Sequence, residues 1–274
     1  MASPTEISAN QLFRLIGAAD QPLIVDVRTD ADFDDDPRLA PGAIRWPFDA
    51  MDRLAETARG RKVVVYCQKG MKLGHGAAAA LRALGVDAET LTGGQFAWRD
   101  AGLPMVAASA IPPRGAAGAT TWVTRQRPKI DRIACPWLIR RFVDPDARFL
   151  FVPASEVLAV AETFQATPFD LEGVFWSHRG DRCTFDTMLE EFGLDTPALA
   201  TLARIIRGAD TNRHELAAES AGLLAASLGF SRMYRDDIAQ LDATMPLYDA
   251  LYRWARDAQD EDHDWPSVAG KSPK

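Results

Sequence analysis

A cysteine that directly follows a run of apolar residues is the first feature of this 274-residue sequence that can do chemistry. Residues 62–66 predict a buried strand, and Cys67 comes directly after it. A short loop that leads into a helix follows: Gln68, Lys69, Gly70, Met71 and Lys72. At the carboxyl edge of a parallel sheet, loop amides and a helix N-terminus attract anions and favour the nucleophilic thiolate. The alternative interpretation is a core cysteine that packs as a small apolar group.

The elements around this cysteine predict an α/β fold. Short apolar runs at residues 23–27, 62–66 and 87–91 are typical of buried strands. Helices are expected at residues 8–16, with Ser8 as N-cap, at 49–58, at 73–84, and after Gly93 and Gly94. This alternation predicts a mostly parallel sheet with helices on both faces.

A composition break divides the chain into two domains. Residues 103–120 are rich in alanine, proline and glycine and show no sustained periodicity, which is typical of a linker. We therefore expect domains at 1–104 and 120–256, a linker at 105–119, and an acidic, disordered tail at 257–274.

The second domain is expected to be α+β, with a mostly helical second half. The periodicity predicts strands at 121–125 and 148–152, a helix at 131–142, a helix capped by Ser155, and helices near 185–192, 196–208, 213–228 and 234–256.

Composition narrows the function classes. The net charge is −7, which does not favour nucleic-acid binding. Three scattered cysteines form no disulfide framework and fit a reducing compartment. Neither a targeting segment nor an apolar run of membrane-spanning length is found, so we expect a cytoplasmic protein without membrane contact.

Four motifs in order make residues 5–104 similar to rhodanese domains. They are Ile24-Val25-Asp26-Val27-Arg28, Pro41-Gly42-Ala43-Ile44, Val64-Val65-Tyr66-Cys67-Gln68-Lys69-Gly70-Met71-Lys72, and Leu91-Thr92-Gly93-Gly94-Gln95-Phe96-Ala97-Trp98. The resemblance implies a sulfurtransferase fold, with Cys67 as the persulfide carrier and the loop from Gln68 to Lys72 as the substrate-binding segment. It also implies a supporting role for Asp26 and Arg28 beside the loop.

The six-residue loop from Cys67 to Lys72 has the length of sulfur-handling members of this family. The related dual-specificity phosphatases use one residue more, which disfavours phosphatase or arsenate-reductase chemistry here. Lys72 stands where the family usually has arginine, and lysine keeps the charge but loses the bidentate fork.

Residues 120–256 resemble the C-terminal domain of the chromate-resistance protein B family. The matching segments include 122–125, 127–142, 149–153, 168–170, 178–186, 207–211 and 247–252. The resemblance implies a link to chromate resistance. Some full-length members are chromate-responsive regulators, but they carry a different N-terminal domain.

Two hypotheses for ligands arise in this second domain. A metal site is suggested by His178 together with Asp131 and Asp210, with Cys183, Asp186 and His214 as further donors that can fold towards it. The spacing matches no strong zinc signature, and the alternative is a set of structural caps and turns. An oxyanion site is suggested by the basic residues Arg125, Arg127, Lys129, Arg132, Arg140 and Arg141, the alternative being a solvated, ion-paired face.

The function that the sequence predicts is that of a thiosulfate sulfurtransferase-like enzyme linked to chromate resistance. Cys67 takes sulfane sulfur from thiosulfate or a related donor and passes it to a thiol or cyanide. Sulfur transfer is expected to need no cofactor, whereas a divalent transition metal is a hypothesis for the second domain. Chromate or another oxyanion is a further candidate partner. The alternative function is a chromate or redox sensor without turnover.

Overall fold

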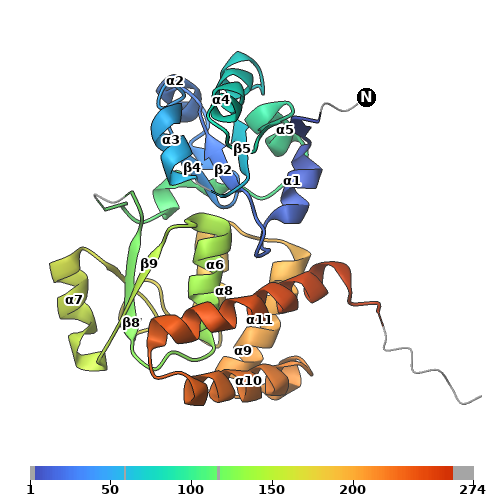
Figure 1. Cartoon of the computed structure of the whole chain (residues 1–274). Helices are drawn as coiled ribbons and strands as arrows, with labels where there is room; N and C mark the ends of the chain where they lie inside the picture. The colour runs from blue at the N-terminus through green and yellow to red at the C-terminus, as the bar shows by residue number, and fades with distance from the viewer. Residues whose placement is uncertain (1–3, 59, 116–117, 262–274) are drawn as a thin grey trace, which may run out of the picture.

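A parallel five-stranded sheet organises the first hundred residues of the computed structural model, which describes residues 4–58, 60–115 and 118–261 (Figure 1). The strand order is β1-β6-β5-β2-β4, and each neighbouring pair is parallel. The strands are β1 (Glu6–Ile7), β2 (Leu23–Asp26), β4 (Ala43–Arg45), β5 (Val63–Tyr66) and β6 (Ala88–Leu91). β2 and β5 are buried along their whole length, as expected of strands covered on both faces.

Helices cover both faces of this sheet. They are α1 (Ala9–Leu15), α2 (Asp30–Asp34), α3 (Met51–Thr57), α4 (Lys72–Ala83) and α5 (Gly94–Asp100). α1 and α5 pack on the face that carries Val64, whereas α3 and α4 pack on the face that carries Val65. The Ser8 cap is confirmed, because its side chain accepts a hydrogen bond from the Gln11 amide. The α/β prediction for this half is therefore confirmed.

The first part of the expected linker is ordered against the N-terminal half. β7 (Val106–Ala107) pairs antiparallel with β3 (Arg38–Leu39), and the 3₁₀ turn η1 (Ala108–Ala110) follows. Val106 is buried in the main core. Two residues of pairing give no visible periodicity, which explains why composition alone indicated a linker here.

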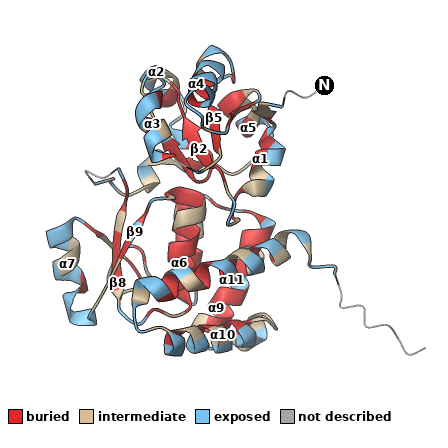
Figure 2. Ribbon diagram, viewed as in Figure 1, coloured by how far each residue is buried: buried red, intermediate tan, exposed pale blue. Residues whose placement is uncertain are grey.

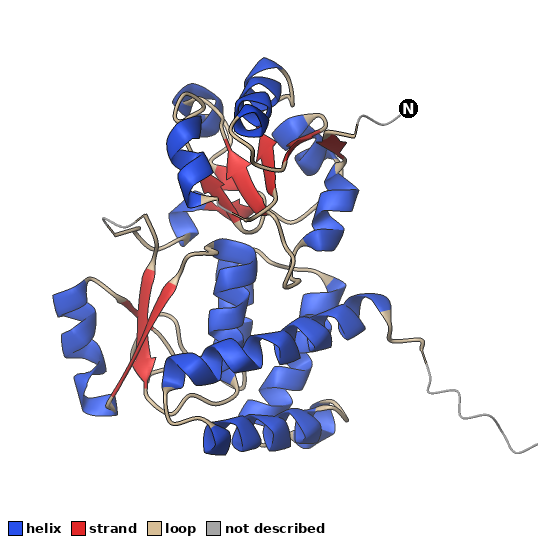
Figure 3. Ribbon diagram, viewed as in Figure 1, coloured by secondary structure: helices blue, strands red, loops and turns tan. Residues whose placement is uncertain are grey.

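A smaller parallel sheet, in the order β10-β8-β9, begins the second half. Its strands are β8 (Thr121–Arg125), β9 (Arg148–Val152) and β10 (Thr167–Pro168). α7 (Val157–Phe164) covers one face, where Val157 packs on Val123, and Trp122 faces the helices on the other. Figure 3 shows this sheet at one side of a mostly helical half, in agreement with the predicted fold class.

The other helices of this half form the bulk of its core, and α6 is buried along most of its length (Figure 2). Their bounds are α6 (Asp131–Leu138), η2 (Ile139–Val143), η3 (Ala154–Glu156), α8 (Thr184–Phe192), α9 (Pro197–Asp210), η4 (His214–Leu216), α10 (Ser220–Met233) and α11 (Asp237–Asp257). No helix in the described ranges has the length and apolar character that a membrane crossing needs.

The structure differs from the local predictions for this half in four details. The helix expected at 131–142 is confirmed as a helical segment, but its last turn, η2, after Leu138, is π-helical. Ser155 lies inside η3 and does not cap α7. The helix expected near 196–208 continues through Gly208 to Asp210, and an added Cβ at Gly208 would overlap the Ser220 hydroxyl, so the small size of this glycine serves close packing. The helix expected at 213–228 is instead η4 followed by α10.

The expected tail begins inside ordered structure, since α11 ends at Asp257 and its C-cap is Ala258. The rest of that predicted tail, residues 262–274, lies outside the described residues.

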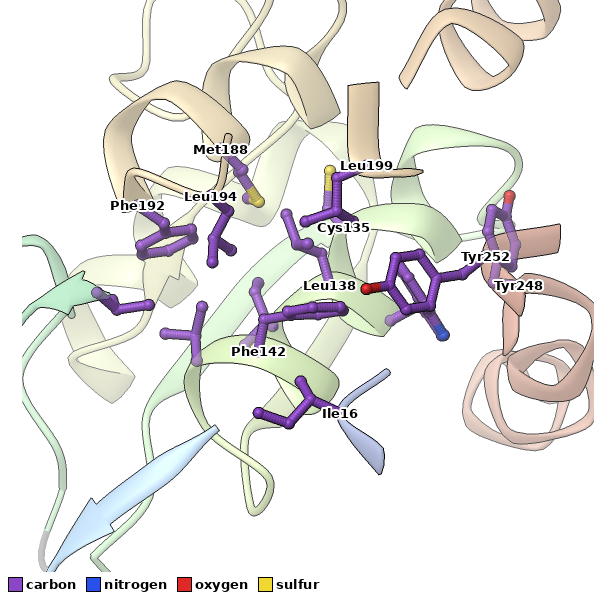
Figure 4. Packing of buried hydrophobic residues seen from close by; sticks show 14 of the residues in the cluster. Ile16, Cys135, Leu138, Phe142, Met188, Phe192, Leu194, Leu199, Tyr248 and Tyr252 are labelled. Carbon is purple, nitrogen blue, oxygen red and sulfur yellow. The ribbon is translucent and has the colours of Figure 1, made fainter. Parts of the chain in front are cut away.

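One hydrophobic core joins the two halves. Ile16, after α1, is buried in the same cluster as Phe142 and Tyr252 (Figure 4). The Gly42 amide donates a hydrogen bond of 2.6 Å to the Phe142 carbonyl oxygen, and the Arg256 guanidinium donates one of 3.2 Å to the Ile16 carbonyl oxygen. The two halves are therefore packed against each other.

Candidate functional sites

Cys67 lies directly after the carboxyl end of β5, the central strand of the larger sheet. The residue is 5% exposed, and its Sγ accepts a hydrogen bond of 3.3 Å from the Met71 amide. An amide that points from the loop to the sulfur stabilises negative charge there. Lys69, Met71 and Lys72 are exposed, so the loop meets solvent while the cysteine at its base is mostly covered.

Glycines let this loop pack tightly on α5. The Gln95 and Phe96 amides donate hydrogen bonds of 3.0 Å to the carbonyl oxygens of Cys67 and Gln68. Gly94 has a φ of +59°, and an added Cβ would overlap the Cys67 carbonyl oxygen and the Gly70 nitrogen. The backbone of α5 thus fixes the position of the cysteine loop.

Asp26 and Arg28 form a buried ion pair one strand away from the cysteine loop. The Arg28 guanidinium donates to both carboxylate oxygens of Asp26, at 2.6 to 3.0 Å, and also to the carbonyl oxygens of Asp36 and Arg38. Desolvation lowers the pKa of Arg28, but its contacts with Asp26 outweigh that effect and raise it. Because Arg28 also bonds to the backbone of Asp36 and Arg38, the ion pair holds the segment before β4 in place.

The second cluster lies where the carboxyl ends of β8 and β10 meet the helices. His178 Nε2 is 3.2 Å from Asp210 Oδ2, 3.4 Å from Asp170 Oδ1 and 3.6 Å from Asp131 Oδ2. Asp131 opens α6, Asp210 ends α9, and Asp170 follows β10. The structure therefore brings together all three predicted residues and adds Asp170, and donor atoms of Asp131, Asp170 and His178 lie within 4.8 Å of one another.

Neighbouring groups hold these carboxylates in fixed orientations. The Thr184 amide donates a hydrogen bond of 2.6 Å to Asp131 Oδ2, and the Thr184 hydroxyl donates one of 3.0 Å to Asp170 Oδ1. Asp170 Oδ2 lies 3.0 Å from the Arg125 guanidinium and 3.3 Å from that of Arg132.

The electrostatics of the cluster follow from burial and from the crowding of like charges. Burial and the nearby carboxylates Asp210 and Asp170 raise the pKa of Asp131 well above its ordinary value. Contacts with Asp170 and Asp210 raise the pKa of His178 to about 10. Burial alone would raise the pKa of Asp170, but His178 and Arg125 outweigh it and lower that pKa. The three carboxylates around His178 Nε2 therefore favour a positive charge at this position.

The other residues considered as metal donors, Cys183, Asp186 and His214, are not part of this cluster. Cys183 is buried before α8, where desolvation and Asp131 raise the pKa of its thiol. The Asp186 carboxylate accepts a hydrogen bond of 3.0 Å from the Cys183 amide and one of 3.1 Å from the Arg207 guanidinium. His214 lies in η4, and no ion pair or metal-donor group in the described ranges includes it.

The basic residues of 125–141 are not gathered into one oxyanion site. Besides the contacts of Arg125 and Arg132 with Asp170, Arg140 pairs with Asp242 and Arg141 makes two hydrogen bonds with Asp249. The ion-paired alternative therefore describes Arg125, Arg132, Arg140 and Arg141.

Asp170 is the site residue that the sequence analysis missed. One feature could have indicated it: Asp170 ends the short segment Pro168-Phe169-Asp170, after a strand. In the structure its φ is +51°. Asp and Asn are among the few non-glycine residues that adopt this conformation readily. A strand of two residues is too short to recognise by periodicity.

Comparison with known proteins identifies both halves. The family model "Rhodanese-like domain" matches residues 8–101, and "ChrB, C-terminal domain" matches residues 122–255. A sulfurtransferase of Allochromatium vinosum is 33% identical over 104 residues, which cover 37% of this chain and 94% of that protein. Protein ChrB of Cupriavidus metallidurans is 39% identical over 132 residues, which cover 48% of this chain.

The match to Protein ChrB covers only 39% of the length of that relative. Among solved structures, a rhodanese-like domain protein from Staphylococcus aureus is 25% identical, with a TM-score of 0.31, over 34% of this chain and 90% of that chain. The chain therefore belongs to the rhodanese-like family through residues 8–101, and it joins this domain to a ChrB C-terminal domain at residues 122–255.

Proposed function

We propose that this protein is a sulfurtransferase that carries sulfane sulfur on Cys67. The observation that carries the proposal is the position of this thiol at the end of β5, with the Met71 amide directed at Sγ and a solvent-facing loop above it. The printed name of the A. vinosum relative supports the same chemistry.

In the first half-reaction, the Cys67 thiolate attacks the outer sulfur of thiosulfate. A sulfur–sulfur bond forms on Cys67, and the bond between the two sulfur atoms of thiosulfate breaks. Sulfite leaves with that electron pair, so total charge is conserved. Loop amides, together with Lys69 or Lys72, balance the charge of the donor and of the departing sulfite.

In the second half-reaction, an acceptor thiolate or cyanide attacks the outer sulfur of the Cys67 persulfide. The new bond gives an acceptor persulfide or thiocyanate, and the electron pair of the broken bond returns to Cys67 as a thiolate. No net oxidation or reduction of the enzyme occurs over the cycle.

The fused ChrB C-terminal domain supports a role in chromate resistance. Persulfides are reductants, which makes sulfur transfer a chemically sensible partner of chromate detoxification. The proposed location of this reaction is the cytoplasm, where thiols stay reduced and all three cysteines remain free.

Intact-mass measurement after incubation with thiosulfate tests the proposal. We expect the wild-type chain to gain one sulfur atom, which excess cyanide then removes. In Cys67→Ser, the mass gain should vanish and the rate of thiocyanate formation should fall on the order of 10³-fold or more.

Cys135→Ala is the matched control, because Cys135 is fully buried in α6 of the other domain. It should gain sulfur like the wild type. Sulfur on Cys67→Ser, or a wild-type chain that never gains sulfur from thiosulfate or another sulfane donor, would contradict the proposal.

A further inference from the structure

A second candidate site is the cluster around His178, which the proposed sulfur chemistry at Cys67 does not use. A cluster of acidic residues alone is weak evidence, because such groups are common at helix ends. The decisive observation concerns Asp131. Its residue is 0% exposed, yet Oδ1 has no hydrogen-bond partner in the described part of the chain. A buried carboxylate oxygen without a partner is costly unless a ligand satisfies it.

The hydrogen-bond balance at His178 points the same way. Three carboxylate oxygens, from Asp131, Asp170 and Asp210, lie 3.2–3.6 Å from its Nε2 atom. An imidazole nitrogen can donate one hydrogen, so it cannot bond to all three oxygens at once, although Thr184 also donates to those of Asp131 and Asp170. A metal ion can accept electron pairs from the nitrogen and from several oxygens at once.

The surrounding groups orient the carboxylates as supporting residues do in metal sites. Thr184 holds Asp131 Oδ2 and touches Asp170 Oδ1, while Arg125 and Arg132 hold Asp170 Oδ2. Such contacts fix the direction of the remaining oxygen lone pairs. Both guanidinium groups pair with Asp170, so neither is an ion-pair partner of Asp131 or Asp210 in the described residues.

The cluster is open to solvent on one side. The His178 side chain is 41% exposed and lines a surface cavity of about 580 Å³, together with Arg125, Asp170 and Ser177. An ion can therefore reach Asp170 and His178 from solvent, and water can complete its coordination.

We propose that Asp131, Asp170, His178 and Asp210 bind one divalent first-row transition-metal ion. One imidazole with several carboxylates is a mixed, mainly oxygen donor set that suits manganese, iron or zinc. This site is independent of the proposed sulfur transfer, because it lies in the other domain and shares no residue with the Cys67 loop.

Titration of the full chain, stripped with a chelator and dialysed, tests the proposal with Mn²⁺ and Zn²⁺ as separate probes. Electron paramagnetic resonance of free Mn²⁺ and chelator competition for Zn²⁺ give the stoichiometry and affinity. We expect one ion per chain for at least one probe, and a rise of several degrees in the unfolding temperature at saturation.

The variant His178→Ala should weaken this binding by about 100-fold or more and abolish the rise in unfolding temperature. His178 is half-exposed, so the variant should fold, and Asp210→Asn at the end of α9 provides a second variant. His75→Ala is the matched control, since His75 is an exposed histidine in the other domain and should leave binding unchanged.

The proposal is overturned if neither ion binds at more than about 0.1 per chain, because a specific site fills under these conditions. It is equally overturned if His178→Ala and Asp210→Asn bind as well as the wild type.

Discussion

Both halves of this protein place polar groups at the carboxyl ends of parallel strands, but they build their sites in different ways. In the rhodanese-like domain, Cys67 and the five residues after it form one continuous loop at the end of β5. In the ChrB C-terminal domain, the cluster takes Asp170 from beyond β10, His178 from a turn, and Asp131 and Asp210 from opposite ends of two helices.

The difference lies in what fixes each site. Backbone groups hold the cysteine loop, through the amides of α5 and the close approach of Gly94. The His178 cluster is held mainly by side chains, namely the Thr184 hydroxyl, Arg125 and Arg132, with one further hydrogen bond from the Thr184 amide. The first site should therefore be sensitive to backbone shape, and the second to side-chain charge.

Among the variants that test this comparison, the largest effect is expected from Gly94→Ala. An added Cβ would overlap the Cys67 carbonyl oxygen and the Gly70 nitrogen, and the φ of +59° disfavours any side chain. The loop must shift, so we expect sulfur transfer to fall about 100-fold and the free energy of unfolding to drop by about 2–4 kcal/mol. Thiocyanate formation and chemical denaturation measure the two quantities.

Gly76→Ala is the matched control within the same domain. Gly76 is exposed inside α4, and an added Cβ there meets nothing within 4 Å. This variant should be more stable by about 0.5–1 kcal/mol and fully active. Equal losses in the two variants would mean that the loop is not fixed by its contact with α5.

Asp131→Asn is the corresponding change in the second site. It removes one of three crowded carboxylates and leaves an amide oxygen to accept the Thr184 hydrogen bond. We expect the metal-free chain to become more stable by about 1 kcal/mol while metal binding is lost, because functional sites often hold groups that disfavour folding. Thermal unfolding of the variant and the wild type, with and without metal, measures both the stability of the metal-free chain and the loss of metal binding.

Asp242→Asn serves as the comparison, since Asp242 forms an exposed pair with Arg140. Its unfolding free energy should change by less than about 0.5 kcal/mol, with metal binding intact. A strongly destabilised Asp131→Asn would indicate that the cluster stabilises the fold instead of holding a ligand.

The smallest effect is expected from Lys72→Arg. Lys72 is exposed at the first position of α4, and arginine there would offer two parallel donors to an oxyanion where lysine offers a point charge. We expect kcat/KM for thiosulfate to rise about threefold to tenfold, with little change in stability. An unchanged value would show that residue 72 does not contact the donor, and a lower value would contradict the expected advantage of the two parallel donors.

The rhodanese-like half could be predicted well because its information is local. The buried strands at 23–27, 62–66 and 87–91 and the Ser8 cap could each be predicted from a few adjacent residues, and the structure contains them. The two-residue strands β1, β3 and β7 gave no such signal. Val106 is buried through a partner about 70 positions earlier in the chain, which composition does not reveal.

The ChrB half shows the limit of local patterns. Gly208 resembles a helix stop but fits the close approach of α10, and this neighbour cannot be inferred from the residues around it. Asp131, His178 and Asp210 could be proposed as a group because the sequence places Asp131 and Asp210 at helix ends and His178 in a polar turn. Asp170 could not, because the strand before it has only two residues and its role depends on pairing with β8.

Gly17 has a consequence for how the whole chain unfolds. Its φ is +80°, and an added Cβ would lie 2.9 Å from Phe142 Cζ and overlap the Tyr252 ring, so the turn after α1 is pressed onto the other domain. Separation of the domains would expose Ile16, Phe142 and Tyr252 to water together. The two domains should therefore melt in one cooperative transition. By linkage, a ligand that binds either domain should raise the melting temperature of both.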